Sequence, residues 1–579
     1  MERNSKLITK KLIYYLIPSF LMIFAMQFSS LLDGVLIGNM ISNEALSATA
    51  LVMPIIYIIQ MPGFALGAGG SIIVANLLGK RDVVTAKKAF SISVIIGMSI
   101  SILFAVLGLF ISRPLANCFS NDEYIIECCY QYVFIYLITD PILSLALIMG
   151  SFIAVDNNPK LSGAFYIISG AAKIGLEVLL IHLWGVYGAA LSTGAGYLLG
   201  LILIIFYIKS KRRLLTFTFK IKGAPFKDVL KASSTSMLNM ALTAIQMLIA
   251  NIVIGQVITD PTDIVIYGLV ANMVFIFDLF CGGIQNVIPN ICGILYGEKD
   301  FYSLKSVARK LYIINIVTTI LIAAFVLSFP GVYSAMFGFN VEANHDYIFF
   351  ILRLYVISFF GYEISKFNMN YYPSIDKNPP SLFCVSLREA IIVIPLTLVL
   401  LYTMGMTGYV VACATTETAT VILTYVFIFF YKKFKKKECK GIFMIEKNEF
   451  KSFDVTVTNE LNNASSISLA LTNFALENGI QERESQLVGL ASEEMVNNIV
   501  TYGYKYDFRH YIDISLKIME GKMVLRIRDD GLPFDPTKYE FDDNEEYSTS
   551  GIRLIEKLTD KMTYMRLLNL NNTVFEINI

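Results

Sequence analysis

Long apolar stretches recur along the first three quarters of the chain and restrict the folds that it can adopt. A helix needs about 20 apolar residues to cross a bilayer. Twelve such stretches lie around residues 13–33, 48–72, 90–111, 127–152, 161–181, 186–208, 230–256, 264–292, 308–329, 347–371, 381–402 and 406–431. Only 16% of the 579 residues are charged, against about 25% in soluble proteins. The sequence therefore predicts a polytopic α-helical membrane protein with twelve spans.

Basic residues gather in every second connection between these stretches. Examples are the segments 80–88, 209–227 and 299–309. Because cytoplasmic loops collect Lys and Arg, this alternation predicts a multi-pass protein of the cell (plasma) membrane with both termini in the cytoplasm. The first stretch lacks a small-residue cleavage site, so we expect it to be retained as a span. The formal net charge of +1 argues against a nucleic-acid partner, which would call for a strongly basic surface.

The two sets of six spans repeat one another. The segment IAVDNNPKLSG around Asp156 aligns with YPSIDKNPPSL around Asp376, an offset of 376 − 156 = 220 residues. The segments GVYGAA and GMTGYV stand at the same offset, and LGKRD and YGEKD stand 218 residues apart. Such a repeat predicts two six-helix bundles, residues 1–215 and 216–437, related by an axis along the membrane normal, with a substrate cavity between them.

The composition changes to mixed polar sequence at about residue 446. Residues 446–579 are therefore predicted to form a separate cytoplasmic domain, an α/β two-layer sandwich. Strands are expected near 452–458, 511–518, 523–529, 562–567 and 573–578, and helices near 465–478, 484–501 and 551–558.

Several ionisable side chains lie within the predicted spans. Asp33 is in the first span, and Lys173 and Glu177 stand four residues apart on one face of the fifth. Glu363 in the tenth span stands three residues before Lys366, close enough to pair with it along one face, and Asp278, Arg388 and Glu417 also lie within spans of the second half. Charged groups inside a bilayer are costly and mark ion or substrate pathways by default. The alternative is a static buried ion pair that cross-links spans.

Several segments of the membrane part resemble the multidrug and toxin extrusion (MATE) family. They are SSLLDGVLIGNM, LGKRD, the two D-x-N-P loops, GVYGAALST, IQNVIPNICGILYGEKD and SLREAIIVIPL, and the resemblance covers nearly all of residues 1–431. It implies that protons or sodium ions moving inward through the amino-terminal half drive the export of cationic, amphiphilic drugs.

The same resemblance implies a cation site in the amino-terminal half. Asp33, Lys173, Glu177 and the hydroxyl of Thr193 in the sixth span match its positions. The family usually has Asn where Lys173 stands, and an ammonium there takes the space of a sodium ion. We therefore favour H⁺ over Na⁺ as the coupling cation. Some relatives also place a transport carboxylate in the tenth span, which implies such a role for Glu363.

Three segments of the tail carry residues suited to a nucleotide. In LASEEMVNNIVTYGY, Glu494 and Asn498 stand four apart on one helix face, the geometry for a carboxylate beside a Mg²⁺-bound triphosphate. In RDDGLPFDP, Asp529 ends a predicted strand and Gly531 frees the following turn. In STSGIRLIEKLTD, Gly551 opens a short helix whose amino-terminal amides can face phosphate.

Taken in this order, these segments resemble the N, G1 and G2 boxes of the histidine-kinase-like ATPase superfamily, which includes anti-sigma-factor kinases. The resemblance covers about residues 450–579 and implies ATP and Mg²⁺ as ligands. It implies that Asp529 accepts the adenine amino group, that Asn498 ligates Mg²⁺ and that Glu494 is the catalytic group positioning the attacking hydroxyl or water. Ser548 and Thr549 stand where the family usually has further glycines, which favours nucleotide binding over turnover.

These observations predict an ion-coupled antiporter that exports drugs or other small amphiphilic, cationic compounds and carries a cytoplasmic ATP-binding regulatory domain. Membrane lipid and a cytoplasmic regulatory protein are the other expected partners. The tail shows no GxxxxGK[ST] P-loop, so ATP is not expected to drive transport. Two alternatives remain open: a membrane-anchored sensor whose tail acts as a serine kinase or anti-sigma switch, and a flippase for lipid-linked sugars.

Overall fold

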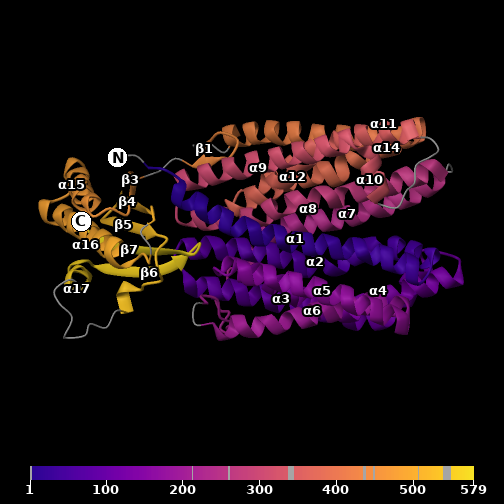
Figure 1. Cartoon of the computed structure of the whole chain (residues 1–579), viewed down its shortest axis with the longest axis horizontal. Coiled ribbons are helices and arrows are strands. Elements are labelled where there is room, and N and C mark those ends of the chain that lie inside the picture. Colours follow the sequence, from indigo (N-terminus) through magenta and orange to yellow (C-terminus); the bar gives the residue numbers. More distant parts are fainter. Residues whose placement is uncertain are drawn as a thin grey trace. The chain divides into compact units, whose positions relative to one another are not determined.

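The computed structural model describes residues 3–210, 213–257, 261–336, 345–434, 439–446, 450–505, 508–538 and 550–579. The chain divides into two compact units (Figure 1). We call them the helical unit, formed by Tyr15–Asp300 and Ala308–Met444, and the sheet unit, formed by Met1–Tyr14, Phe301–Val307 and Ile445–Ile579.

Long helices make up the membrane part of the chain. Those of the first half are α1 Lys6–Met40, α2 Asn43–Gly79, α3 Val83–Asn117, α4 Glu123–Val155, α5 Pro159–Trp184 and α6 Val186–Lys209. Those of the second half are α7 Phe226–Val257, α8 Pro261–Gly297, α9 Phe301–Ser328, α10 Pro330–Met336, α11 His345–Val356, α12 Ser358–Ser374, α13 Asn378–Ser386, the π-helix Leu387–Ile391 and α14 Val393–Phe434. Capping side chains begin several of them; for example, Asp82 accepts a hydrogen bond from the Thr85 amide.

Eleven helical segments among the described residues are long and apolar enough to cross a membrane. The last of them, Asn378–Phe434, is 57 residues long and is interrupted at Gly405, where the backbone leaves the helical region. It therefore covers both the eleventh and the twelfth predicted spans. The predicted fold class of a polytopic helical membrane protein is confirmed.

The internal repeat is visible in the backbone. Gly185, between α5 and α6, has φ 54° and ψ −128°, and Gly405, 220 residues later, has φ 62° and ψ −142°. Positive φ of this kind is readily adopted only by glycine. Arg81 and Lys299, the matching residues of LGKRD and YGEKD, both have positive φ as well. The two halves therefore share turn geometry as well as sequence.

The two halves of the helical unit touch through glycines. A Cβ atom added to Gly79 on α2 would overlap the Ile294 carbonyl of α8, and one added to Gly297 would overlap the Asn76 carbonyl of α2. Small residues of this kind let helix backbones approach closely in membranes. The contact between α2 and α8 is therefore made largely by backbone at this point.

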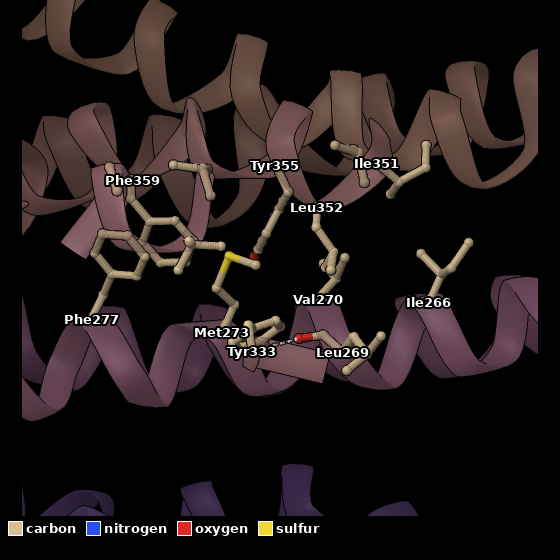
Figure 2. Packing of buried hydrophobic residues seen from close by; sticks show 14 of the residues in the cluster. Ile266, Leu269, Val270, Met273, Phe277, Tyr333, Ile351, Leu352, Tyr355 and Phe359 are labelled. Atoms are coloured by element: carbon tan, nitrogen blue, oxygen red, sulfur yellow. Dashed lines mark hydrogen bonds between the residues drawn. The ribbon is translucent and has the colours of Figure 1, made fainter. Parts of the chain in front are cut away.

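Each half also has an apolar cluster of its own. Figure 2 shows part of the cluster in the second half, where α8 faces α10, α11 and α12. The rings of Phe277 and Phe359 stack with centroids 3.7 Å apart. The Tyr333 hydroxyl donates to the Leu269 carbonyl at 2.5 Å, so its buried polar end is satisfied.

The sheet unit contains one five-stranded antiparallel sheet with the strand order β3-β4-β5-β7-β6. Its strands are β3 Lys451–Thr458, β4 Tyr511–Met519, β5 Lys522–Asp529, β6 Lys561–Leu567 and β7 Leu570–Asn578. The helices of the tail are α15 Asn462–Glu477, α16 Glu482–Tyr502 and α17 Ser550–Leu558, and Pro536–Lys538 forms a 3-10 turn. Two short strands, β1 Cys439–Lys440 and β2 Ile445–Glu446, come before them in the chain. Alternate residues such as Val455 and Val457 pack with the inner faces of the helices. The predicted two-layer sandwich is confirmed.

Candidate nucleotide and ion sites

The amino-terminal half brings three of its four predicted ion-site residues together. The Lys173 ammonium on α5 donates to Asp33 Oδ2 on α1, and their side chains are 9% and 15% exposed. Glu177, one turn after Lys173, is fully buried, and neither of its oxygens accepts a hydrogen bond from the described residues. A second buried carboxylate thus lies one helical turn from the ion pair of Lys173 and Asp33.

Thr193 lies on α6 beside this group. Its buried hydroxyl is 3.4 Å from the Tyr136 hydroxyl of α4, and no hydrogen bond among the described residues joins it to Asp33, Lys173 or Glu177. α6 does contact α5 here, because a Cβ atom at Gly196 would meet the Lys173 Cβ at 2.8 Å. Thr193 therefore belongs to the surroundings of the site and not to its ion pair.

Glu363 is buried on α12 in the second half, but its partner differs from the predicted one. Its Oε2 accepts a hydrogen bond from Gln285 Nε2 of α8 at 2.6 Å. Lys366 instead binds both oxygens of Asp278 on α8, at 2.6 and 2.7 Å. The hydroxyl of Tyr362 also contacts Asp278, at 3.2 Å. The charged partner of Lys366 therefore lies on the facing helix α8 and not on the neighbouring turn of α12.

The π-helix adds a further buried ion group. Arg388 pairs with its neighbour Glu389, and its Nε donates to Glu417 Oε1 of α14 at 2.8 Å. The guanidinium of Arg388 and the ammonium of Lys366 each lie 4.5 Å from the ring centroid of Tyr362. The second half therefore carries one contiguous cluster of charges.

Two buried carboxylates in the helices were missed in the sequence. Glu389 lies in the π-helix, and Asp140, on α4, is fully buried with Ser144 donating to it at 3.3 Å. Both fall within the predicted spans 127–152 and 381–402. The rule that marks charged residues inside a bilayer would have found them.

In the sheet unit, Asp529 ends β5 with its side chain buried. Its Oδ1 accepts hydrogen bonds from the Gly531 amide at 2.8 Å and from Asn571 Nδ2 at 2.9 Å. Within the described part of the chain, no donor contacts Oδ2. Burial raises the pKa of Asp529 to about 6, and these two hydrogen bonds limit the rise. Asn571 on β7 was missed in the sequence, because nothing there shows that β7 pairs with β5.

Glu494 and Asn498 lie on one face of α16, close to the start of α17. A Cβ atom at Gly551 would overlap the Glu494 carboxylate. The neighbouring Glu493 instead accepts a hydrogen bond from Ser465 of α15 at 2.8 Å. Asn498 donates through Nδ2 to the Glu494 carbonyl at 2.8 Å, which leaves its side-chain oxygen as a possible ligand.

The Gly531 turn packs against the end of α16. The Leu532 amide donates to the Gly503 carbonyl at 2.8 Å, and a Cβ atom at Gly531 would meet that carbonyl oxygen at 2.6 Å. The turn after β5 and the helix that carries Asn498 are thus fixed to each other. Ser548 and Thr549 lie outside the described residues.

A magnesium ion fits this arrangement only together with a nucleotide. Among the described residues, no group of three or more His, Cys, Asp or Glu side chains could hold a metal. Mg²⁺ commonly takes one or two protein ligands and completes its shell with phosphate oxygens and water, and Asn498 can supply one oxygen. A shallow cavity of about 500 Å³ nearby, lined by Asn459–Asn462, Val500, Tyr504 and Lys505, contains none of the predicted nucleotide residues.

Comparisons with known proteins match both parts of the chain. Residues 18–179 match the MatE family, and residues 457–575 match the histidine kinase-like ATPase domain. The multidrug export protein MepA of Staphylococcus haemolyticus is 23% identical over 291 residues, which cover 49% of this chain and 64% of MepA. MepA of Staphylococcus saprophyticus is 22% identical over 328 residues, covering 56% of this chain and 71% of that protein.

Solved structures agree on the fold of the helical part. A MOP-superfamily transporter from Pyrococcus furiosus matches with a TM-score of 0.68 and 18% identity, over 75% of this chain and 98% of that one. The MATE multidrug transporter DinF-BH matches with a TM-score of 0.67 and 21% identity, over 74% and 98%. The chain therefore joins a MatE region with the MATE transporter fold to a carboxy-terminal histidine kinase-like ATPase domain.

Proposed function

We propose that this protein is an antiporter that exports small amphiphilic organic cations in exchange for protons. The observation that carries the proposal is the buried group of Asp33, Lys173 and Glu177. The relatives named above are multidrug export proteins, and the chain spans 64% of the length of the first of them. Its activity and substrates are therefore inferred from its own site.

The charges of this group favour a proton over a sodium ion. Asp33 already contacts a cation, the Lys173 ammonium. With both carboxylates ionised, the site would hold an uncompensated negative charge, which is costly in a buried setting. A proton on Glu177 removes that charge. Release of the proton on one side of the membrane and uptake on the other would then couple the site to alternating access.

The second half offers the better site for the cationic substrate. Its cluster contains four carboxylates and two basic side chains, namely Asp278, Glu363, Glu389, Glu417, Lys366 and Arg388. A positive ligand would offset the excess of carboxylates, and the Tyr362 ring offers an aromatic face. Glu363 is the member that forms no ion pair within the described residues and is our candidate for contact with the substrate.

We further propose that the tail binds ATP with Mg²⁺ and regulates transport. Asp529 would accept the adenine amino group on Oδ2, Asn498 would contribute an oxygen to Mg²⁺, and Glu494 would orient a hydroxyl or water. Gly551 places the start of α17, whose free amides would face phosphate, directly beside the Glu494 carboxylate. The expected partner is a cytoplasmic protein that binds the tail differently with and without nucleotide. The proposed domains are residues 1–215 and 216–437 for transport and residues 446–579 for regulation.

Transport by the reconstituted protein tests the proton antiport. Proteoliposomes that hold ethidium would be given either a pH gradient or a sodium gradient. We expect only the pH gradient to drive flux, and Glu177→Gln to lower that flux at least about tenfold, since one proton-transfer group contributes on this order. Glu127→Gln is the matched control, because the Glu127 side chain is 40% exposed and pairs with Arg113.

Two results would remove the proposal. One is a Glu177→Gln variant that transports at the wild-type rate, and the other is flux driven by sodium alone. The sensor and flippase alternatives both predict no gradient-driven flux of ethidium in the wild type. The same assay therefore separates the antiporter from both alternatives.

A further inference from the structure

The amino-terminal residues of the chain are bound to the sheet of the sheet unit. The Arg3 guanidinium pairs with Asp454 on β3 at 2.6 Å. The Asn4 amide donates to Thr456 Oγ1 at 3.1 Å, and that hydroxyl is also 3.1 Å from the Asn4 carbonyl. The segment is thus fixed to one strand by an ion pair and by its backbone.

A second contact lies beside the candidate nucleotide site. Lys10 donates to Asp530 Oδ2 at 2.8 Å, and the other oxygen of Asp530 lies 2.8 Å from His510 Nδ1. The Asp530 side chain is 3% exposed. Hydrogen bonds from Lys10 and His510 keep the pKa of Asp530 low despite its burial. Asp530 directly follows Asp529, so Lys10 holds the turn that would carry adenine.

The same segment begins a helix that serves both units. α1 runs without interruption from Lys6 to Met40, and its residues up to Tyr14 belong to the sheet unit. The remainder belongs to the helical unit and includes Asp33 of the candidate proton site. The residue that contacts the nucleotide turn and the residue that pairs with Lys173 are therefore on one helix.

We propose that nucleotide binding at Asp529 tightens the attachment of residues 3–10 to the sheet unit through Asp530, and that the tail regulates transport through α1. The inference rests on the proposed binding of nucleotide and names its route of regulation. A nucleotide would order the Asp529–Gly531 turn, whose middle residue is the partner of Lys10. By linkage, loss of the Lys10 attachment must then weaken nucleotide binding by the same factor by which nucleotide strengthens that attachment.

The size of the effect follows from the exposure of the pair. Lys10 is 59% exposed, so its interaction with Asp530 is screened by solvent. Forming an exposed ion pair of this kind changes the equilibrium constant of the process that it stabilises by about two- to fivefold. We expect Lys10→Met to weaken the binding of the ATP analogue AMP-PNP with Mg²⁺ by about two- to fivefold, and Lys10→Arg to restore it.

The experiment uses the full chain in detergent. Calorimetric titration with AMP-PNP would compare the wild type with Lys10→Met, Lys10→Arg and Lys6→Met. Lys6 is the matched control, because its ammonium lies over the Tyr511 ring at 5.2 Å and contacts no carboxylate among the described residues. Hydrogen exchange of the amides of residues 4–10 would be measured with and without AMP-PNP. We expect AMP-PNP to slow it at least about twofold in the wild type, Lys10→Arg and Lys6→Met, but not in Lys10→Met.

The coupling is refuted if AMP-PNP binds the wild type and either readout fails. Those failures are a Lys10→Met variant with wild-type affinity, or exchange of residues 4–10 that nucleotide leaves unchanged. In both cases nucleotide binding itself would stand. If AMP-PNP does not bind the wild type, the nucleotide role of the tail and the coupling fall together.

Discussion

Replacing Asp529 with Asn is expected to stabilise the sheet unit while abolishing nucleotide binding. Both hydrogen bonds to Asp529 end on Oδ1, and the oxygen of an Asn side chain can accept the same two. The change removes a negative charge from a side chain that is 3% exposed. It also removes the acceptor that adenine would need on Oδ2, because the amide nitrogen there is a donor.

The magnitude follows from the pKa of Asp529. Burial raises it from the ordinary value of 3.8 to about 6. The folded state therefore holds the proton more tightly than the unfolded chain, and ionised Asp529 opposes folding. This cost grows as the pH rises from 3.8 to about 6 and is constant above that range. At about 1.4 kcal/mol per pH unit, it reaches about 3 kcal/mol at pH 8 and roughly half of that at pH 5.

Scanning calorimetry of the full chain without nucleotide tests this reasoning. For a unit of this size, about 3 kcal/mol corresponds to roughly 6 to 12 °C in the unfolding midpoint. Asp529→Asn should raise the midpoint by that amount at pH 8 and by roughly half at pH 5. Asp530→Asn is the opposing control: the pKa of Asp530 is lowered by its partners, so its loss should lower the midpoint. A fall of the midpoint in both variants at pH 8 would refute the argument.

Three further predictions concern the helices and the phosphate side of the nucleotide site. Glu363→Gln should slow ethidium flux by about tenfold or more while the pH-gradient dependence remains, because it removes a buried charge that would pair with the cationic substrate. This would be measured in proteoliposomes against Glu127→Gln. Gly551→Ala should displace the Glu494 carboxylate, because the added Cβ atom would overlap it. Since that carboxylate ends a flexible side chain, we expect only a small loss of AMP-PNP affinity in calorimetric titration, and a large loss would contradict that geometry. Phe277→Ala should destabilise the second half by about 3–5 kcal/mol, seen as a lower unfolding midpoint, since its ring stacks on Phe359 at 3.7 Å.

Local patterns in the sequence were sufficient for the fold. The offset between GVYGAA and GMTGYV predicted a repeat, and Gly185 and Gly405 have nearly the same dihedral angles. The placement of Glu494 and Asn498 on one helix face also follows from their spacing alone. The turn geometry and the placement of side chains on one helix face depend on neighbours within a few residues, and these neighbours can be read directly from the sequence.

Partners across elements were not predictable in this way. Lys366 pairs with Asp278, 88 residues away, and not with Glu363 three residues before it. Asn571 reaches Asp529 only because β7 pairs with β5. The attachment of Lys10 to Asp530 joins residues 520 positions apart. Each of these three contacts depends on how two elements pack against each other. The periodicity of a single sequence carries no information on such packing.

The close approach of Gly79 and Gly297 has an energetic consequence for the contact between the two halves. Side chains that interlock would bury apolar area at about 25 cal/mol per Å² and hold one state firmly. Here Gly79 and Gly297 contribute no side chain, and the helices approach through backbone instead. The contact between the two halves at this point therefore depends on the fit of two backbones, and a side chain in place of either glycine would force α2 and α8 apart.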